Sequence, residues 1–370
     1  MTRAGERPTV LLNCIKMHEG ASRALHGNFS HIQQLYNELI KNQNFNFTVH
    51  VDAVTLPIMR ASIPEERLHV TQAPVDSIVQ QDCEIVKAVR RVRPDIYHKP
   101  TGQLPLIPLS CKCISGIADL IHLHAPMSWT KTLYKQMSYQ LSVFYADCVI
   151  CTSHATRNEV IQRLRVKPEK VRVVYHGSTR MTETPREVAL PRMPFFVTFG
   201  HQRHKNVEAC IKALAIATHR EKVQARLVVV GVCPGRAALE RLAASEGVSE
   251  LVSMVGRVSN GELRFLYRHA IALLFLSKYE GFGLPILEAM VEGCPVIASN
   301  VYSIPEVVGQ AGLLFAVDDY EGVAAAMIKI AADPSLRGEL VVKGYNNAER
   351  FSWRTAADQV AEIYKELLHS

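Results

Sequence analysis

The sequence lacks any apolar run long enough to cross a membrane, a span that needs about 20 residues. Its first segment, Met1–Pro8, carries charges of both signs and no apolar core of the kind found in signal peptides. No Gly-x-Gly-x-x-Gly follows an expected strand, which argues against a nicotinamide-dependent dehydrogenase. The first two absences lead us to expect a cytoplasmic protein.

The sequence also lacks the pattern of a disulfide framework or a zinc site. Its nine cysteines are an odd number and are scattered, as expected in a reducing compartment. Cys111 and Cys113 have the wrong gap for a zinc knuckle. Cys148 and Cys151 fall in an expected buried strand, where residues three apart point to opposite faces. We therefore expect buried thiols and no metal.

The positive charge is concentrated in the first half. Residues 1–190 hold 23 Lys and Arg against 16 Asp and Glu, whereas residues 191–370 hold 19 of each. A chain of 370 residues has room for two domains, so one of them would be basic. Such a domain suits an anionic acceptor or an anionic membrane surface, although scattered solvated lysines would give the same count. We expect no nucleic acid partner.

The most informative stretch runs from Tyr279 to Met290. The apolar run Ile271–Leu276 predicts a strand, a turn with two glycines follows, and Pro285 opens a helix. Amides that converge at such a helix start favour an anion such as phosphate. Glu280 and Glu288 flank this place, and a carboxylate can accept hydrogen bonds from a sugar diol. An ordinary helix cap with two solvated glutamates fits the spacing equally well.

The residues Gly281-Phe282-Gly283-Leu284-Pro285 between these glutamates resemble the signature of retaining nucleotide-sugar glycosyltransferases of family 4. The resemblance continues through Glu292–Asn300 and Ile304–Gly312. It implies an α/β fold of the GT-B type, with two facing Rossmann-like domains that have parallel sheets. It also implies that Glu288 holds the nucleotide ribose, that Glu280 lies by the donor sugar, and that the backbone of residues 281–284 meets the diphosphate, that is Gly281, Phe282, Gly283 and Leu284.

Strands that alternate with helices predict a parallel sheet in each half of the chain. Residues 179–194 shift to Thr, Glu, Arg and Pro with little periodicity, which predicts a linker. We expect an acceptor-side domain over 1–178, the linker over 179–194 and a donor-binding domain over 195–351. The resemblance implies that the last helix, 352–370, returns to the first domain.

The expected strand Leu120–Leu123, which runs on to Pro126, lies where the family has a strand that ends in a His-Asp pair. His124 takes the place of the histidine that touches the donor sugar, and Ala125 replaces the aspartate. His122, on the same strand face, is the alternative, and a structural histidine is a third interpretation. The resemblance also places Gly27, at the end of a loop that carries Lys16, His18, Arg23 and His26, over the donor diphosphate.

The segment from Ser128 to Ala146 predicts a helix in which aromatic residues and lysines alternate. Such a mixture is found in helices that lie on a membrane surface. Apolar residues at helical spacing more often face the protein interior, so we favour a helix that packs on the core.

The loop after the expected strand Phe195–Gly200 supplies cations. Lys205 matches a lysine that binds the donor diphosphate in the family, and Arg203 is the only arginine available for the second cation. A cation at this place stabilises the charge that grows on a departing diphosphate. By resemblance, the backbone of Gly256, Arg257 and Val258 meets the nucleotide base.

The sequence thus predicts a retaining glycosyltransferase that moves a hexose from a nucleotide diphosphate donor to a saccharide or lipid-linked acceptor. Mannose from GDP-mannose is the preferred donor, and UDP-glucose or UDP-N-acetylglucosamine are alternatives. No Asp-x-Asp pair occurs, so neither a metal nor another cofactor is expected. A nucleotide-sugar epimerase and a non-catalytic protein of the same fold remain as rivals. Peripheral contact with the inner face of the membrane would be made by the basic domain.

Overall fold

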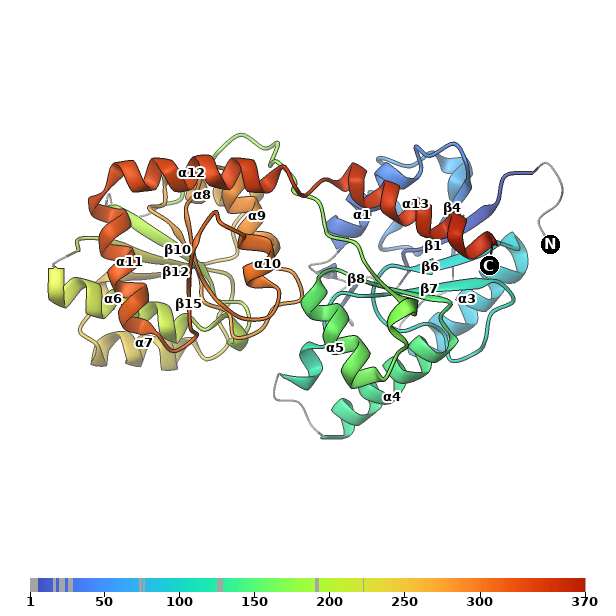
Figure 1. The fold of residues 1–370 in the computed structure, drawn as a ribbon, viewed down its shortest axis with the longest axis horizontal. Coiled ribbons are helices and arrows are strands. Elements are labelled where there is room, and N and C mark those ends of the chain that lie inside the picture. The colour runs from blue at the N-terminus through green and yellow to red at the C-terminus, as the bar shows by residue number, and fades with distance from the viewer. Residues whose placement is uncertain are drawn as a thin grey trace. The chain divides into compact units, whose positions relative to one another are not determined.

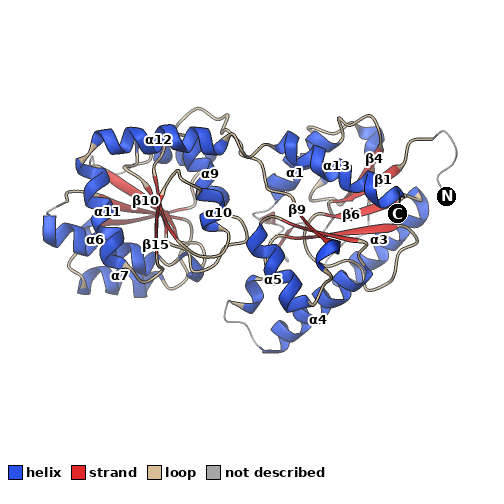
Figure 2. Ribbon diagram, viewed as in Figure 1, coloured by secondary structure: helices blue, strands red, loops and turns tan. Residues whose placement is uncertain are grey.

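The chain folds into two compact units. Unit 1 comprises residues 1–177 and 352–370, and unit 2 comprises residues 178–351. The computed structural model describes residues 6–15, 18–19, 24–25, 29–72, 75, 77–124, 129–189, 193–221 and 223–369 (Figure 1). Each unit is a parallel sheet with helices on its faces (Figure 2). This is the α/β architecture with parallel sheets that the sequence predicts.

The sheet of unit 1 has seven parallel strands in the order β5-β4-β1-β6-β7-β8-β9. The apolar residues of the inner strands are buried, as expected for a sheet covered on both faces, whereas those of the edge strand Leu68–Val70 are half-buried. The strands are β1 (Thr9–Asn13), β4 (Asn46–Val51), β5 (Leu68–Val70), β6 (Ile96–Lys99), β7 (Lys112–Ile117), β8 (Cys148–Cys151) and β9 (Val171–Val173). The short strands β2 (His18–Glu19) and β3 (Ala24–Leu25) form a separate antiparallel pair in the loop after β1.

Helices cover both faces of this sheet. One core lies under α1 and α13, and the opposite core lies under α3 and α5. The capping box at Ser77 fixes the start of α3, because its hydroxyl accepts from the amide of Gln80 while the Gln80 side chain accepts from Ser77. The helices are α1 (Phe29–Leu39), α2 (Leu56–Met59), α3 (Ile78–Val92), α4 (Trp129–Tyr145), α5 (His154–Leu164) and α13 (Trp353–His369).

The predicted strand at residues 120–123 is wrong. The fifth strand of the sheet is β7, and Ile121–Leu123 form a turn of 3-10 helix. The Asp119 side chain accepts a hydrogen bond from the amide of Ile121 at 3.0 Å, which turns the chain at this point. Consequently His122 and His124 do not share a strand face, and Ala125 and Pro126 lie outside the described residues.

The preference for a core-packed helix at residues 128–146 is also wrong. A helix forms there as α4, but its buried residues are Ser138, Ser142 and Val143. Most of its large apolar side chains are exposed. The prediction of a helix here is confirmed, but the prediction that its apolar side faces the core is wrong.

The sheet of unit 2 has six parallel strands in the order β12-β11-β10-β13-β14-β15. They are β10 (Phe195–Phe199), β11 (Arg226–Val230), β12 (Val252–Gly256), β13 (Leu273–Phe275), β14 (Val296–Ser299) and β15 (Leu313–Phe315). The helices are α6 (Val207–Glu221), α7 (Arg236–Ser245), α8 (Asn260–His269), α9 (Leu284–Val291), α10 (Ile304–Val308), α11 (Tyr320–Ala332) and α12 (Pro334–Ala348).

Part of the predicted linker packs on unit 2. The Glu183 carboxylate accepts hydrogen bonds from the Asn260 side chain and from the amide of Gly261, both at 3.0 Å. The Arg264 side chain donates to the carbonyl of Glu183 at 2.8 Å. This segment thereby contributes acceptors at the start of α8. No helix of the described residues is long and apolar enough to span a membrane.

Candidate functional site

The strand order of unit 2 creates a site at the carboxyl ends of β10 and β13. β10 pairs with β11 on one side and with β13 on the other. The chain therefore runs from β10 to β11 and β12 on one side and continues from β13 on the opposite side. Ligands of open parallel sheets bind at such a switch point. The loop after β10 contains Lys205, and the loop after β13 contains Glu280. Residues that are far apart in sequence are thus brought together at this edge.

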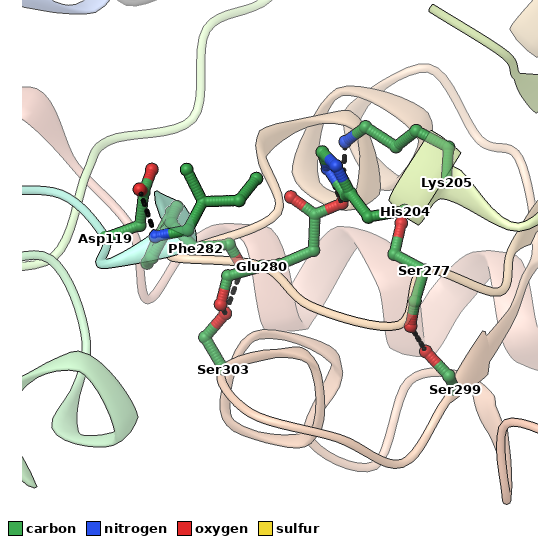
Figure 3. A network of polar contacts seen from close by, with 9 residues as sticks. Asp119, His204, Lys205, Ser277, Glu280, Phe282, Ser299 and Ser303 are labelled. Carbon is green, nitrogen blue, oxygen red and sulfur yellow. Dashed lines mark hydrogen bonds and ion pairs between the residues drawn. The ribbon is translucent and has the colours of Figure 1, made fainter. Parts of the chain in front are cut away.

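Lys205 and Glu280 form an ion pair at this place (Figure 3). The Lys205 Nζ lies 2.6 Å from Glu280 Oε1, and the two side chains are only 7% and 12% exposed. The same Nζ lies 5.0 Å from the centre of the Phe275 ring. His204 Nε2 is 3.9 Å from Glu280 Oε1, and burial lowers the pKa of His204, so its imidazole is neutral at pH 7. Lys205 is therefore the main positive charge on Glu280.

The loop that carries Glu280 is held by serines from the neighbouring strand and turn. The Ser303 hydroxyl lies 2.9 Å from the carbonyl of Glu280 and 3.1 Å from that of Phe282. The Ser299 hydroxyl donates to the carbonyl of Ser277 at 2.6 Å, and Figure 3 shows both contacts. These hydrogen bonds fix the backbone between β13 and α9. A fixed backbone keeps its amides aimed without a cost in reorganisation.

Gly283 allows the chain to enter α9. Its φ is +102°, in the left-handed region that favours glycine, and Leu284 then starts the helix with Pro285 second. In the first turn of α9, Pro285 has no N–H and the Ile286 amide donates to the carbonyl of Gly283 at 3.0 Å, while the helix dipole adds positive potential there. The expected anion site at residues 281–284 therefore lies at a helix start, beside Lys205.

Glu288 lies one turn inside α9. Its Oε2 accepts a hydrogen bond from the hydroxyl of Tyr267 at 3.2 Å, and Tyr267 is fully buried on α8. Burial raises the pKa of Glu288, while Tyr267 and Lys205 act in the opposite direction. The Tyr267 hydroxyl also lies 3.3 Å from the carbonyl of Pro285, so it links the Glu288 carboxylate to the first turn of α9. Sequence reasoning missed Tyr267 because it resembles any apolar residue of an amphipathic helix.

The remaining donor-side residues lie at the same edge but outside this network. Gly256 ends β12 with φ +73°, and its carbonyl accepts from the amide of Gly231 at 2.6 Å. Arg257 is exposed and Val258 half-buried in the turn before α8. Arg203 is exposed and lines a hollow of about 220 Å³ beside the start of α7, together with Gly200. The structure thus places Arg203 in a hollow that Lys205 does not line.

In unit 1 the two candidate histidines are separated. His124 pairs with Glu159 of α5 through its Nε2, whereas His122 is buried and its ring stacks on that of Tyr139 at 5.1 Å. Burial lowers the pKa of His122. Gly27, Lys16, Arg23 and His26 lie outside the described residues, and only the backbone of His18 is described, in β2.

Two units, each with a parallel sheet covered by helices, agree with the GT-B fold. Solved structures agree on the fold: the sucrose-phosphate synthase of Thermosynechococcus elongatus matches with a TM-score of 0.74 at 20% identity, over 98% of this chain and 100% of that one. The chain belongs to the family 4 glycosyltransferases. The model described as Glycosyltransferase Family 4 matches residues 29–178, and that described as Glycosyl transferases group 1 matches residues 183–347.

Two curated relatives carry mannosyltransferase names. The O-antigen chain mannosyltransferase B of Escherichia coli is 28% identical over 294 residues, which are 76% of this chain and 76% of that protein. The MMP alpha-(1->4)-mannosyltransferase of Mycolicibacterium hassiacum is 29% identical over 224 residues, which are 60% of this chain and 54% of that protein. The chain therefore covers only about half of the second relative.

Proposed function

We propose that this protein transfers mannose from GDP-mannose to a saccharide or lipid-linked acceptor, with retention at the anomeric carbon and without a metal. The observation that carries the proposal is the buried Lys205–Glu280 pair beside the start of α9. The mannosyltransferase names of two relatives support the choice of sugar. The cytoplasm is the proposed compartment, with peripheral contact of unit 1 at the inner face of the membrane.

In this mechanism the bond between the anomeric carbon and the diphosphate oxygen breaks, and the acceptor oxygen bonds to the same face of the sugar. The proton of the acceptor hydroxyl passes to the departing phosphate oxygen, so no enzyme nucleophile is needed. Lys205, with Arg203 as the second cation, stabilises the charge that develops on the diphosphate. The Lys205 ammonium has three donors and gives one to Glu280, which leaves donors for phosphate oxygens.

Glu288 would bind the ribose hydroxyls through the oxygen that Tyr267 does not occupy. Glu280, held by Lys205 and Ser303, would accept from donor sugar hydroxyls, and family resemblance assigns His124 of unit 1 to the same sugar. The Glu159 carboxylate orients His124. We expect His124→Ala to lower kcat about 100-fold, the scale of one positioned polar group, while the Kd for GDP stays unchanged.

The experiment that tests the donor assignment is a thermal-shift screen with GDP, UDP, ADP and TDP. A ligand that binds only the folded state raises stability, by about 2.7 kcal/mol at 100 times its Kd. We expect GDP to give the largest shift in melting temperature. A larger shift with UDP would indicate that the donor is a UDP-sugar. No shift with any nucleotide would refute a donor site in unit 2.

Transfer itself is tested with GDP-mannose and a mixed pool of oligosaccharide acceptors. Retention predicts that the new linkage has the α configuration of the donor, which proton NMR of the anomeric signal reports. Activity should persist in EDTA. Isomerisation of the donor without acceptor would instead identify an epimerase, and binding of nucleotide without any turnover would identify a non-catalytic protein.

A further inference from the structure

Helix α4 of unit 1 presents its apolar side chains to solvent and its serines to the core. Trp129 is 76% exposed and Phe144 is 75% exposed, although both are large apolar residues. Isolated exposed apolar residues are normal, but a contiguous set marks an interaction surface. The set on α4 comprises Trp129, Leu133, Tyr134, Met137, Leu141, Phe144 and Tyr145.

These residues form one face of the helix. Trp129, Leu133, Met137 and Leu141 follow one another at intervals of four, so their side chains lie in a row. Because one turn rises 5.4 Å, the helix of 17 residues gives a face about 25 Å long. Figure 1 shows α4 at the border of unit 1, next to α5. We call this set the α4 face.

Hydrogen bonds prevent α4 from rotating about its axis to turn this face toward the core. The buried Ser138 hydroxyl donates to the carbonyl of Tyr134 in the same helix at 2.7 Å, so the contact that fixes the rotation of α4 is made by Ser142. The amide of Leu104 donates to the Ser142 hydroxyl at 2.8 Å, and the Ser115 hydroxyl lies 3.1 Å from it. Rotation of the helix would take Ser142 away from the buried amide of Leu104, and an unsatisfied buried donor costs about 1–3 kcal/mol. The outward direction of the apolar residues is therefore built into the fold.

The surroundings of the α4 face are positive. The helix carries Lys131 and Lys135 and no acidic residue, and residues 129–172 hold eight Lys and Arg against three Asp and Glu. The Lys170 Nζ donates to the carbonyls of Val143 and Phe144 at 2.9 and 3.1 Å. This contact holds the basic segment 163–172 against the end of the helix. Much of the net charge of +7 thus lies around one apolar face.

A hollow of about 770 Å³ continues the α4 face at its end. Phe144 and Val143 line it together with apolar residues of α5 and α13, Leu164 and Ile363. Arg165 and Lys167 lie in the same lining, as do the acidic residues Asp147, Glu169 and Glu366. Apolar walls with basic groups beside them suit an amphiphile whose head is anionic.

We propose that the α4 face, with the basic segment 163–172, docks on the surface of an anionic phospholipid bilayer. Aromatic and aliphatic side chains of such a helix enter the boundary between headgroups and acyl chains by about 5–10 Å, while lysines remain at the phosphates. A second copy of this chain is a poorer occupant, because its own positive surface would meet a positive surface. This inference rests on the peripheral contact of unit 1 proposed above and names its surface, which does not depend on the nucleotide site of unit 2.

The two tryptophans of the chain allow a direct test. Trp129 lies on the α4 face, whereas Trp353 is 8% exposed and packs against His31 and His176. The full chain is mixed with vesicles of phosphatidylcholine alone or with 30% phosphatidylglycerol, and tryptophan emission and sedimentation are measured. We expect binding to the anionic vesicles only, a blue shift of the emission and quenching by brominated lipid. The Trp129→Phe variant should still sediment but lose the shift.

Matched variants distinguish vesicle binding through the α4 face from non-specific binding to vesicles. Leu133→Ser with Phe144→Ser should weaken vesicle binding at least 10-fold, because two large apolar side chains no longer enter the bilayer. Val342→Ser, which changes a side chain of 58% exposure on α12 in unit 2, should leave binding unchanged. Lys131→Gln and Lys135→Gln should each weaken it about fivefold, and salt should weaken it further.

Three outcomes would overturn the proposal. One is equal binding to neutral and anionic vesicles, and another is sedimentation with no change at Trp129. The third is a concentration-dependent dimer that Leu133→Ser with Phe144→Ser abolishes, which would show a second copy on the α4 face. Circular dichroism and GDP binding of every variant verify that the fold is intact, so a failed donor assignment and a failed membrane proposal give different results.

Discussion

The two units are built on the same kind of sheet but differ in what surrounds their candidate functional residues. Unit 2 holds its functional loop with buried contacts: Lys205 to Glu280, and Ser303 to two carbonyls of the same loop. Unit 1 leaves a row of large apolar side chains on α4 in solvent, at the border of a basic segment. In the functions proposed above, unit 2 takes a small ligand and unit 1 an extended surface. Each prediction below tests one side of this contrast.

The largest effect is expected from Lys205→Ala. It removes the buried cation beside the start of α9 and leaves Glu280 unpaired, so kcat should fall about 1000-fold, the upper range for loss of one transition-state donor. Steady-state transfer from GDP-mannose measures this. Lys278→Ala, an exposed lysine of the neighbouring loop, is the control and should retain activity. Comparable losses in both variants would contradict a specific role for Lys205.

The next effect concerns the stability of unit 2. Glu292 is 1% exposed and accepts from Arg264 and Arg268 of α8, at 3.0 and 2.7 Å. Removal of one partner of a buried pair costs about 3 kcal/mol, so Glu292→Ala should lower the free energy of unfolding by that amount in urea. Glu240→Ala, which breaks an exposed pair with Arg236, should cost less than about 1 kcal/mol. An equal loss in the two variants would remove the contrast between buried and exposed contacts.

A smaller effect is expected at Glu288. Glu288→Gln should weaken GDP binding about 10-fold, since a hydrogen bond to a charged group contributes about 1.5–3 kcal/mol. Burial raises the pKa of Glu288, so protonation and loss of wild-type affinity should occur at a higher pH than for an ordinary glutamate as the pH falls. Titration calorimetry across pH 4 to about pH 8 measures this. Tyr267→Phe should move the loss to still higher pH, because its hydrogen bond lowers that pKa.

An affinity for GDP that falls equally with pH in the wild type and in Glu288→Gln would exclude Glu288 as the titrating group. The direction of the pH dependence follows from the proposed contact between Glu288 and the ribose hydroxyls. The carboxylate is the stronger acceptor for hydroxyls, so the affinity for GDP is full above the pKa of Glu288 and falls below it.

The smallest effect is expected on the stability of unit 1. Leu133→Ser on the α4 face should change the free energy of unfolding by less than about 0.5 kcal/mol, as for other surface substitutions. Val143→Ala, on the buried side of the same helix, should cost about 1–2 kcal/mol. Urea titrations of the two variants report this difference. A large cost at Leu133 would show that the α4 face is covered within the molecule.

The sequence was sufficient for the class of fold and for the glycine-rich turn before α9. Periodicity found α1, α3 and most strands because their apolar residues repeat at the spacing of a covered helix or strand. It missed β7, whose six residues include Cys113, Ser115 and Gly116 in place of a run of branched apolar residues. It misplaced that strand at Leu120–Leu123, where the Asp119 side chain holds a turn.

Contacts between distant residues could not be predicted from spacing. The pair of Lys205 and Glu280 depends on β10 and β13 being neighbours, which only the strand order determines. The period of α4 gave a helix, but the period alone does not state which side faces the core. The orientation of α4 is fixed by Ser142, whose hydroxyl accepts from the amide of Leu104 on the buried side. Buried polar residues with partners are invisible to an argument from hydrophobicity.

The place of α13 has a consequence for how the chain folds during synthesis. Trp353, Val360 and Tyr364 belong to the core of unit 1, together with residues of β1 and β4. Residues 178–351, all of unit 2, leave the ribosome before these core residues do. Domains fold as units once their chain is available. Unit 2 can therefore close its core first, and the half of the protein that begins the chain is the last to be completed.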